Sequence, residues 1–147
     1  MNKPAGGRGP TGFGDTKGPC SGRLYDPDNC GGPIQTLDWR NADITAAGIA
    51  QVRQHVKRFG TIAANQKMIA RLERINSGQL QATDFDKRYF THELREQERY
   101  HNSGVPDGQD PGYKVWNDTH TATLEDYRIN EKTEPLYHPD ITAEDFE

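Results

Sequence analysis

The sequence predicts a mostly α-helical protein: a small helical domain of four to five helices behind a flexible Gly/Pro-rich N-terminal leader. Apolar residues recur at spacings of three and four along residues 34–147, which is the period of one helical face. No segment alternates polar and apolar residues as a strand does, and Tyr113 to Trp116 would form one short strand at most. The 147 residues favour a single domain, and a hydrophobic content of 32% limits the size of its core.

The expected leader, residues 1–33, is bounded by two glycine clusters, Gly6 to Pro10 and Gly31 to Pro33. A glycine-rich run can cradle phosphate, but this one follows no strand and opens no helix. We therefore expect a tether to a larger upstream polypeptide. Cys20 and Cys30 are spaced for a small disulfide loop, and their spacing does not match a zinc site.

The first helix is expected after Asn41, Asp43 or Thr45, which are all N-cap residue types. Its apolar stripe consists of Ile49, Val52, Val56 and Phe59. Gly60 is a suitable residue just past the helix end. His55 lies in the last turn, where a cation interacts favourably with the helix dipole, so we expect a surface or dipole-related role for it rather than a ligand role.

A second helix should begin at Thr61 and end at Asn76-Ser77-Gly78. The third should begin at Thr83 or Asp84 and continue to about Tyr100. Two inward stripes can be drawn on this third helix. They are Phe85, Tyr89, His92, Glu96 and Tyr100 on one side, and Phe90 and Leu94 on the other. A helix contacted on two sides suits the centre of a small bundle.

A turn-rich loop follows from His101 to Gly112. Asp118 should cap the fourth helix, whose inward face carries His120, Leu124 and Tyr127. Residues 134–140 contain two prolines and should be non-helical. Thr142 and Asp145 have the spacing of a capping box for a last short helix.

Charge is distributed unevenly along the chain. Residues 34–100 hold eleven basic and eight acidic side chains, whereas residues 101–147 hold three basic and eleven acidic ones. This pattern fits a nucleic-acid surface beside a solvating tail, and it equally fits an ordinary mixed surface. The pI near 5.7 argues against strong non-specific binding to polyanions. No apolar run is long enough to span a membrane, and the first residues lead us to expect no signal peptide in this segment.

Three histidines stand in distinctive contexts: His92 beside Glu93, His120 on an apolar stripe, and His138 between Tyr137 and a proline. Each alone is commonly a structural residue, but together they indicate a site. One chemistry is metal-free RNA cleavage, with imidazoles as general base and acid. The other is a divalent metal that activates water. The His-Glu-x-x-His zinc-protease motif is absent, because Glu96 occupies the position of its second histidine.

Several short motifs occur in a fixed order along the chain. They run from Ile44-Thr45-Ala46-Ala47-Gly48-Ile49 through Phe90-Thr91-His92-Glu93-Leu94 and Thr119-His120 to Leu136-Tyr137-His138-Pro139-Asp140. Over about residues 43–141 the chain resembles the C-terminal toxin domains of bacterial polymorphic toxins, of the contact-dependent inhibition, Rhs and wall-associated type. The chain departs from that pattern by its long 104–112 loop and by Thr119, where alanine is usual.

This resemblance implies an interbacterial toxin that is secreted or surface-delivered as part of a larger carrier polypeptide. It would act in the cytoplasm of the target bacterium and be neutralised by a cognate immunity protein. Many such domains are nucleases that attack tRNA or other RNA. The resemblance implies as candidate catalytic residues His92, Glu93, His120, Tyr137 and His138.

The leading hypothesis from the sequence is therefore a ribonuclease toxin that uses histidine acid/base chemistry and needs no cofactor. The expected contacts to the RNA backbone are Arg71, Arg74, Lys87 and Arg88. One alternative is a metal-dependent hydrolase or DNase toxin that uses the same histidine and glutamate residues, with a divalent metal as cofactor. Another is a non-catalytic helical interaction module in which the histidines are structural.

Overall fold

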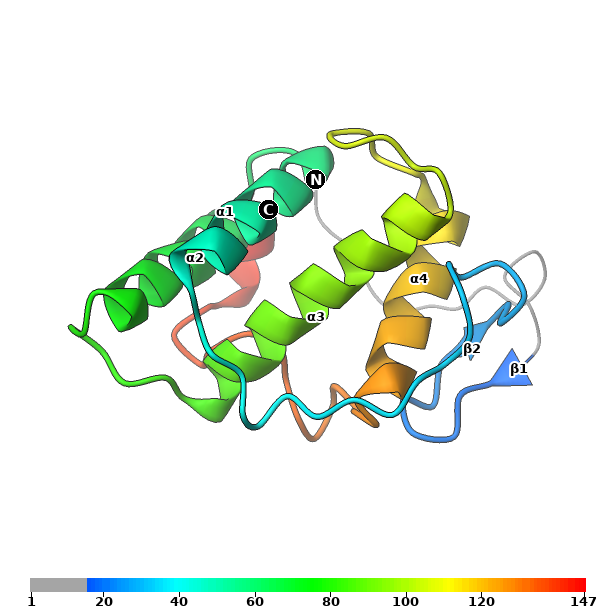
Figure 1. The fold of residues 1–147 in the computed structure, drawn as a ribbon, viewed down its shortest axis with the longest axis horizontal. Helices are drawn as coiled ribbons and strands as arrows, with labels where there is room; N and C mark the ends of the chain where they lie inside the picture. The colour runs from blue at the N-terminus through cyan, green and yellow to red at the C-terminus, as the bar shows by residue number, and fades with distance from the viewer. Residues whose placement is uncertain (1–15) are drawn as a thin grey trace.

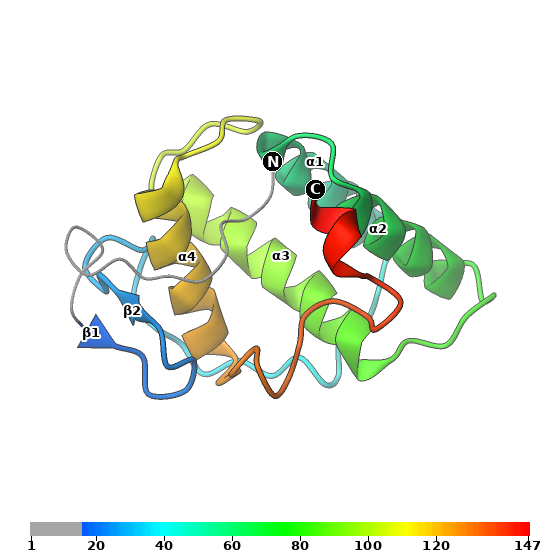
Figure 2. The ribbon, with the colours of Figure 1, turned by 180° about the vertical axis from the view of Figure 1, so that it is seen from behind.

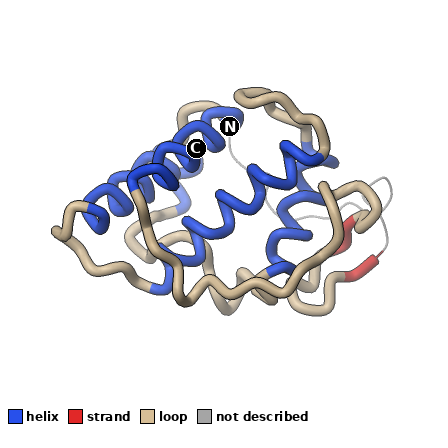
Figure 3. The backbone as a smooth tube through the Cα atoms, in the orientation of Figure 1, coloured by secondary structure: helices blue, strands red, loops and turns tan. Residues whose placement is uncertain are grey.

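A computed structural model describes residues 16–147 and confirms the mostly helical class (Figures 1 and 3). Its four α-helices are α1 (Ala46–Val56), α2 (Ala63–Asn76), α3 (Asp84–Asn102) and α4 (Tyr113–Asp126). Two 3-10 turns are η1 (Lys57–Phe59) and η2 (Ala143–Phe146). Strands β1 (Thr16–Lys17) and β2 (Leu24–Tyr25) form a small antiparallel pair, with Thr16 opposite Tyr25.

Helix α3 is central, as its two inward stripes predict. It runs between the α1–α2 pair on one side and α4 on the other (Figures 1 and 2). The Thr83 hydroxyl accepts a hydrogen bond from the Asp86 amide, and the Asp86 carboxylate accepts one from the Thr83 amide. This capping box fixes where α3 begins. The position of α3 means that side chains on several of its faces are buried.

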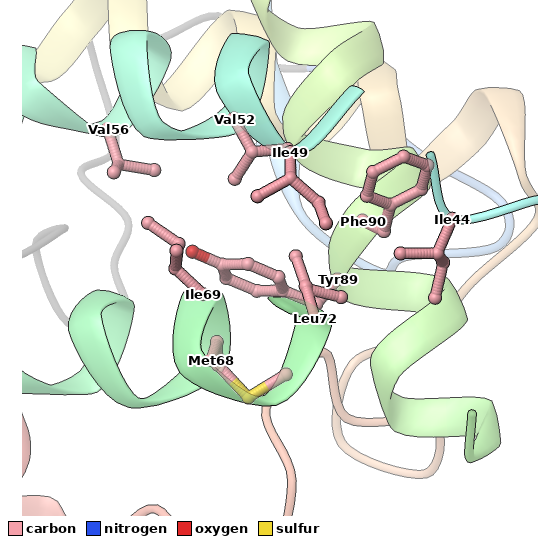
Figure 4. Close-up of a cluster of buried hydrophobic side chains, with 9 residues drawn as sticks. All are labelled: Ile44, Ile49, Val52, Val56, Met68, Ile69, Leu72, Tyr89 and Phe90. Carbon is pink, nitrogen blue, oxygen red and sulfur yellow. The ribbon is translucent and has the colours of Figure 1, made fainter. Parts of the chain in front are cut away.

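The apolar core lies between α1, α2 and the first half of α3 (Figure 4). It consists of Ile44, Ile49, Val52, Val56, Met68, Ile69, Leu72, Tyr89 and Phe90. Gly48 is buried against the Phe90 ring, where any side chain would collide. Thr45 caps α1 by accepting from the Gly48 amide, as one of the three predicted caps, and Gly60 ends η1 at φ 86. This core fixes α1 and α3 side by side.

Two predicted helix starts are wrong. Helix α2 has Ile62, not Thr61, at its N-cap, with no side-chain cap. Helix α4 begins at Tyr113, so residues 113–116 are helical rather than extended and Asp118 lies inside the helix. The Asp118 carboxylate is engaged by Lys114 Nζ at 2.7 Å and by the Asp26 amide at 3.0 Å. Asp118 is therefore a buried partner of the N-terminal segment and does not cap α4.

The predicted leader boundary at residue 33 also differs from the structure, because residues 16–33 pack onto α3 and α4. Tyr25 and Cys30 are buried against Ala122, and both cysteines are free thiols. The Arg99 guanidinium donates to the carbonyls of Cys30, Gly32 and Pro33. Residues 1–15 of the predicted leader lie outside the described residues. The Gly/Pro-rich composition of 16–33 thus reflects a segment that covers α4, with every residue of α4 from Trp116 to Asp126 buried.

Within residues 16–147, no helix is long and apolar enough to cross a membrane.

Candidate functional site

A cluster of histidine and glutamate side chains lies between α1, α3 and α4. Helix α3 presents His92, Glu93 and Glu96, because residues three and four apart share a face. Helix α1 contributes His55, and α4 contributes His120. The first four of these residues have no exposed surface, and His120 is 3% exposed. Burying this many ionisable groups is costly unless each finds a compensating partner.

Three ligand-type atoms converge on one point. His92 Nε2 lies 3.1 Å from Glu96 Oε2 and 3.0 Å from His120 Nδ1, and His120 Nδ1 lies 3.3 Å from Glu96 Oε2. Metal–ligand bonds of about 2.0–2.2 Å place neighbouring ligands of one ion about 3.3–3.6 Å apart in a tetrahedron and about 2.8–3.1 Å apart at right angles. The three atoms thus have the spacing of one face of a coordination polyhedron.

A second convergence lies on the other side of Glu96. His55 Nε2 lies 3.0 Å from Glu96 Oε1 and 3.2 Å from Glu93 Oε1. The donor atoms of these three residues all lie within 4.8 Å of one another. Glu96 therefore belongs to both groups, with a different carboxylate oxygen directed to each.

The cluster approaches the surface at Glu131, in the segment after α4. His120 Nε2 lies 2.9 Å from Glu131 Oε2, and Glu131 also pairs with Arg23 at 3.3 Å. The Glu131 side chain is 32% exposed. If Nε2 of His120 donates to Glu131, then Nδ1 of the same ring carries a lone pair toward Glu96 and His92. A carboxylate on the far nitrogen is the usual partner of a metal-binding histidine.

Burial and charge act differently on the two fully buried histidines. Burial lowers the pKa of His92 despite its contact with Glu96, so this ring is neutral near neutral pH. Burial also opposes charge on His55, but the hydrogen bonds to Glu93 and Glu96 outweigh it and raise the pKa of that ring. Glu131 is held by His120 and Arg23, which outweigh its burial and lower its pKa to about 2.

Several buried polar atoms near the cluster have no hydrogen-bond partner among residues 16–147. They include Nδ1 of His55, Nδ1 of His92 and the hydroxyl of Tyr100. The Tyr100 ring lies 5.6 Å from the His55 ring, and Tyr100 has no exposed surface. The hydrogen-bond network of this region is thus incomplete among the described residues, which is uncommon for buried polar atoms.

The structure brings together three of the five predicted catalytic residues, His92, Glu93 and His120. Tyr137 and His138 lie elsewhere: the Tyr137 hydroxyl donates to Asn65 Oδ1 at 3.1 Å, and the His138 ring packs on Phe85. His138 Nδ1 accepts from the Asp140 amide at 3.0 Å. None of these contacts involves the His–Glu cluster, so a role for Tyr137 and His138 in the site stays a prediction.

Two of the four predicted RNA-contacting residues have internal partners. Arg71 forms a two-point ion pair with Asp86, at 2.8 and 2.9 Å. Arg88 is buried, donates to the Pro135 carbonyl and lies over the rings of Trp39 and Phe85. Arg74 is exposed and Lys87 is partly exposed. Arg71 and Arg88 would have to leave these partners before they could bind a phosphate.

The structure adds His55 and Glu131 to the residues that the sequence predicts for the site. The sequence predicts a surface or dipole-related role for His55, yet this residue is buried and in contact with both glutamates. A signal was present, because His55 lies three residues after Val52 and four before Phe59, on the apolar stripe of its helix. Glu131 belongs to an irregular segment without periodicity, and no local pattern distinguishes it.

Comparisons with protein-family models, with curated proteins and with solved structures found no match to this chain. The resemblance to polymorphic-toxin domains therefore stays a prediction, and the function proposed below rests on the site geometry.

Proposed function

We propose that this protein is a divalent-metal-dependent hydrolase whose ion is held by His92, Glu96 and His120. The observation that carries the proposal is the triangle of 3.0, 3.1 and 3.3 Å between their three donor atoms. Two histidines and one carboxylate leave coordination positions open for water and substrate. A divalent ion held by these residues would supply activated water for hydrolysis at neutral pH.

The same distances weigh against the metal-free ribonuclease mechanism. A general base and a general acid must stand on opposite sides of the reacting phosphate, each within about 3 Å of its own oxygen. Here His92 Nε2 and His120 Nδ1 are 3.0 Å apart, in direct contact, and no phosphate fits between them. Two ring nitrogens this close suit a shared ion better than two separate proton transfers.

Each residue around the triangle has a defined part in this mechanism. Glu131 holds the His120 ring so that Nδ1 faces the ion. Trp116 stacks on His120 at 4.6 Å and keeps the ring from turning. Arg23 lies beside Glu131 on the partly exposed side of the site and would meet an anionic substrate arriving there.

The biological setting follows the resemblance seen in the sequence. We propose a toxin domain with nuclease activity on RNA or DNA, carried by a larger polypeptide and neutralised by an immunity protein. Among the predicted backbone contacts, Arg74 is exposed, while Lys87 and the Asp86-paired Arg71 are partly exposed. Expressing the domain in bacteria, with gel analysis of total RNA and DNA, tests this setting separately from the metal.

The test of the chemistry uses the full chain with tRNA and plasmid DNA as substrates. We expect cleavage to stop after EDTA treatment and to return with zinc or manganese. His92→Ala and His120→Ala should be inactive in all conditions. His101→Ala, at an exposed histidine outside the cluster, is the matched control and should retain full activity. Unchanged cleavage by metal-stripped protein would refute the metal mechanism.

The complete burial of the cluster favours a second candidate, a non-catalytic helical module in which the ion is structural. Four of the five clustered residues have no exposed surface, so a polymer can reach them only if the Glu131 segment moves. A chain that binds metal, leaves RNA and DNA intact and does not inhibit bacterial growth would favour this candidate over the hydrolase.

A further inference from the structure

We propose that the cluster holds two metal ions, with Glu96 bridging them and His55 and Glu93 completing the second site. This inference rests on the proposed function for its first ion and adds a second one. It makes the centre dinuclear, a class that supports hydrolytic displacement by clamping both the attacking and the leaving oxygen.

The second donor set has its own geometry. His55 Nε2 faces two carboxylate oxygens at once, Glu96 Oε1 at 3.0 Å and Glu93 Oε1 at 3.2 Å. One ring nitrogen carries at most one proton, so it can satisfy the two oxygens only by sharing that proton. An ion between the three atoms would bind all of them directly.

Glu96 has the orientation of a bridging ligand. Its Oε1 faces His55, while its Oε2 faces His92 and His120. The two oxygens of one carboxylate thus serve two separate donor sets. Two-metal sites in hydrolases have ions about 3.5–4 Å apart, a separation that a bridging carboxylate spans.

The charges also fit two ions. When ionised, the carboxylates of Glu93, Glu96 and Glu131 would supply three negative charges around the cluster, and the first two residues are fully buried. Two divalent ions and one hydroxide would neutralise these carboxylates with neutral imidazoles as the remaining ligands. Carboxylates and imidazoles mixed in this proportion suit zinc, manganese and iron.

The position of the ligands on the fold supports a preformed site. Helix α3 supplies Glu93 and Glu96 within one turn, and α1 is held against α3 by the apolar core beside His55. His55 also meets Phe59 edge-on at 5.8 Å, which fixes its ring. Ligands on packed helices are held more precisely than ligands on loops.

The test is a cobalt(II) titration of the metal-stripped full chain, with bound metal measured by elemental analysis and electron paramagnetic resonance. We expect two cobalt ions per chain and a resonance weakened by coupling between them. His55→Gln should hold one ion with a full, uncoupled signal, and that retained ion shows that the variant is folded. His101→Gln, at an exposed histidine, should still hold two coupled ions.

The outcomes separate this inference from the proposed function. One ion per wild-type chain, lost in His92→Ala and kept in His55→Gln, would refute the second site and leave the proposed hydrolase standing. Two coupled ions without nuclease activity would support the dinuclear centre and refute the nuclease. Two ions that remain in His55→Gln would place the second ion elsewhere and overturn the inference.

Discussion

Two buried polar clusters lie along α3, and they are built on opposite principles. In one, Arg95 and Arg99 converge on Asp126 of α4. In the other, His92, Glu93 and Glu96 converge with His55 and His120. Both consist of ionisable side chains with little or no exposed surface.

In the arginine cluster both guanidinium groups donate to carboxylates. Arg99 donates to both oxygens of Asp126, at 2.9 and 2.7 Å, and to three backbone carbonyls of residues 30–33. Arg95 donates to Asp126 at 2.9 Å and to Glu98 at 2.7 Å. These contacts pair the buried charges with one another and hold residues 30–33 and α4 onto α3.

In the histidine–glutamate cluster, a few imidazole nitrogens are shared among several carboxylate oxygens. Both carboxylates of α3 are directed at imidazole nitrogens that also face one another or a second carboxylate. The positive charge that satisfies Asp126 comes from arginines, whereas here a metal ion would supply it. The difference separates a structural polar cluster from a candidate binding site on the same helix, and it can be tested by mutation.

The largest effect is expected in the arginine cluster. Asp126→Ala leaves two buried guanidinium groups without their carboxylate and should lower the free energy of unfolding by about 3–5 kcal/mol. Denaturant unfolding followed by circular dichroism measures this. Asp38→Ala is the control, because its pair with Arg40 is more than half exposed, and it should unfold close to wild type. Equal stability of the two variants would contradict a structural role for Asp126.

The next effect concerns stabilisation by metal. Zinc at 100 times the dissociation constant of the His92–Glu96–His120 site should raise the unfolding free energy of the wild type by about 2.7 kcal/mol through that site alone. Glu96→Gln, which removes the shared ligand, should gain nothing from zinc, as thermal unfolding with and without the ion would show. Glu98→Gln, two residues away with a 62% exposed side chain, should respond as wild type does. If zinc stabilised Glu96→Gln as much as the wild type, Glu96 would not be a ligand of the ion.

A smaller effect is expected at a third satisfied group, Asp86. Burial opposes its charge, but hydrogen bonds from Arg71 and Thr83 outweigh it, so its pKa is lowered. The ionised form therefore stabilises the fold above the unfolded pKa near 4, and this contribution is lost as pH falls through the lower folded pKa. Asp86→Asn should cost about 1.5–3 kcal/mol at pH 7 and progressively less in acid. A cost that stays constant down to pH 2 would exclude a role for the charge.

The smallest effect is expected at Glu131, which contacts His120 rather than the ion. Glu131→Gln should weaken zinc affinity about 10–100-fold without abolishing binding. Competition with a chromophoric chelator measures this change. Glu134→Gln, three residues further along the same segment, should leave the affinity unchanged. Complete loss of zinc in Glu131→Gln would make Glu131 a direct ligand instead.

The parts of the fold that the sequence predicts are those with local signals. The Thr83–Asp86 capping box and the 3.6-residue stripes predict α3 and its central position, and Gly60 predicts the end of the first helical segment. The start of α4 at Tyr113 was missed, because the buried role of Asp118 depends on Asp26, ninety-two residues earlier. The packing of residues 16–33 likewise depends on Arg99 reaching distant carbonyls, which no periodicity reveals.

In the candidate site, too, the residues with local sequence signals can be predicted and the others cannot. His92, Glu93 and His120 could be predicted, because an imidazole and a carboxylate on an inward helical face are conspicuous in the sequence. His55 was readable from its stripe but was assigned to the helix dipole, since a histidine in a last turn has a ready local explanation. The position of Glu131 depends on the course of an irregular segment, which the sequence does not predict. That Glu96 is shared by the two donor sets follows only from the three-dimensional structure.

The most direct test of the metal site is anomalous diffraction from crystals of the full chain grown with zinc, with data collected on both sides of the zinc absorption edge. The predicted result is a strong anomalous peak within about 2.0–2.2 Å of His92 Nε2, Glu96 Oε2 and His120 Nδ1. Peaks confined to exposed histidines such as His101, with none between α3 and α4, would contradict the account.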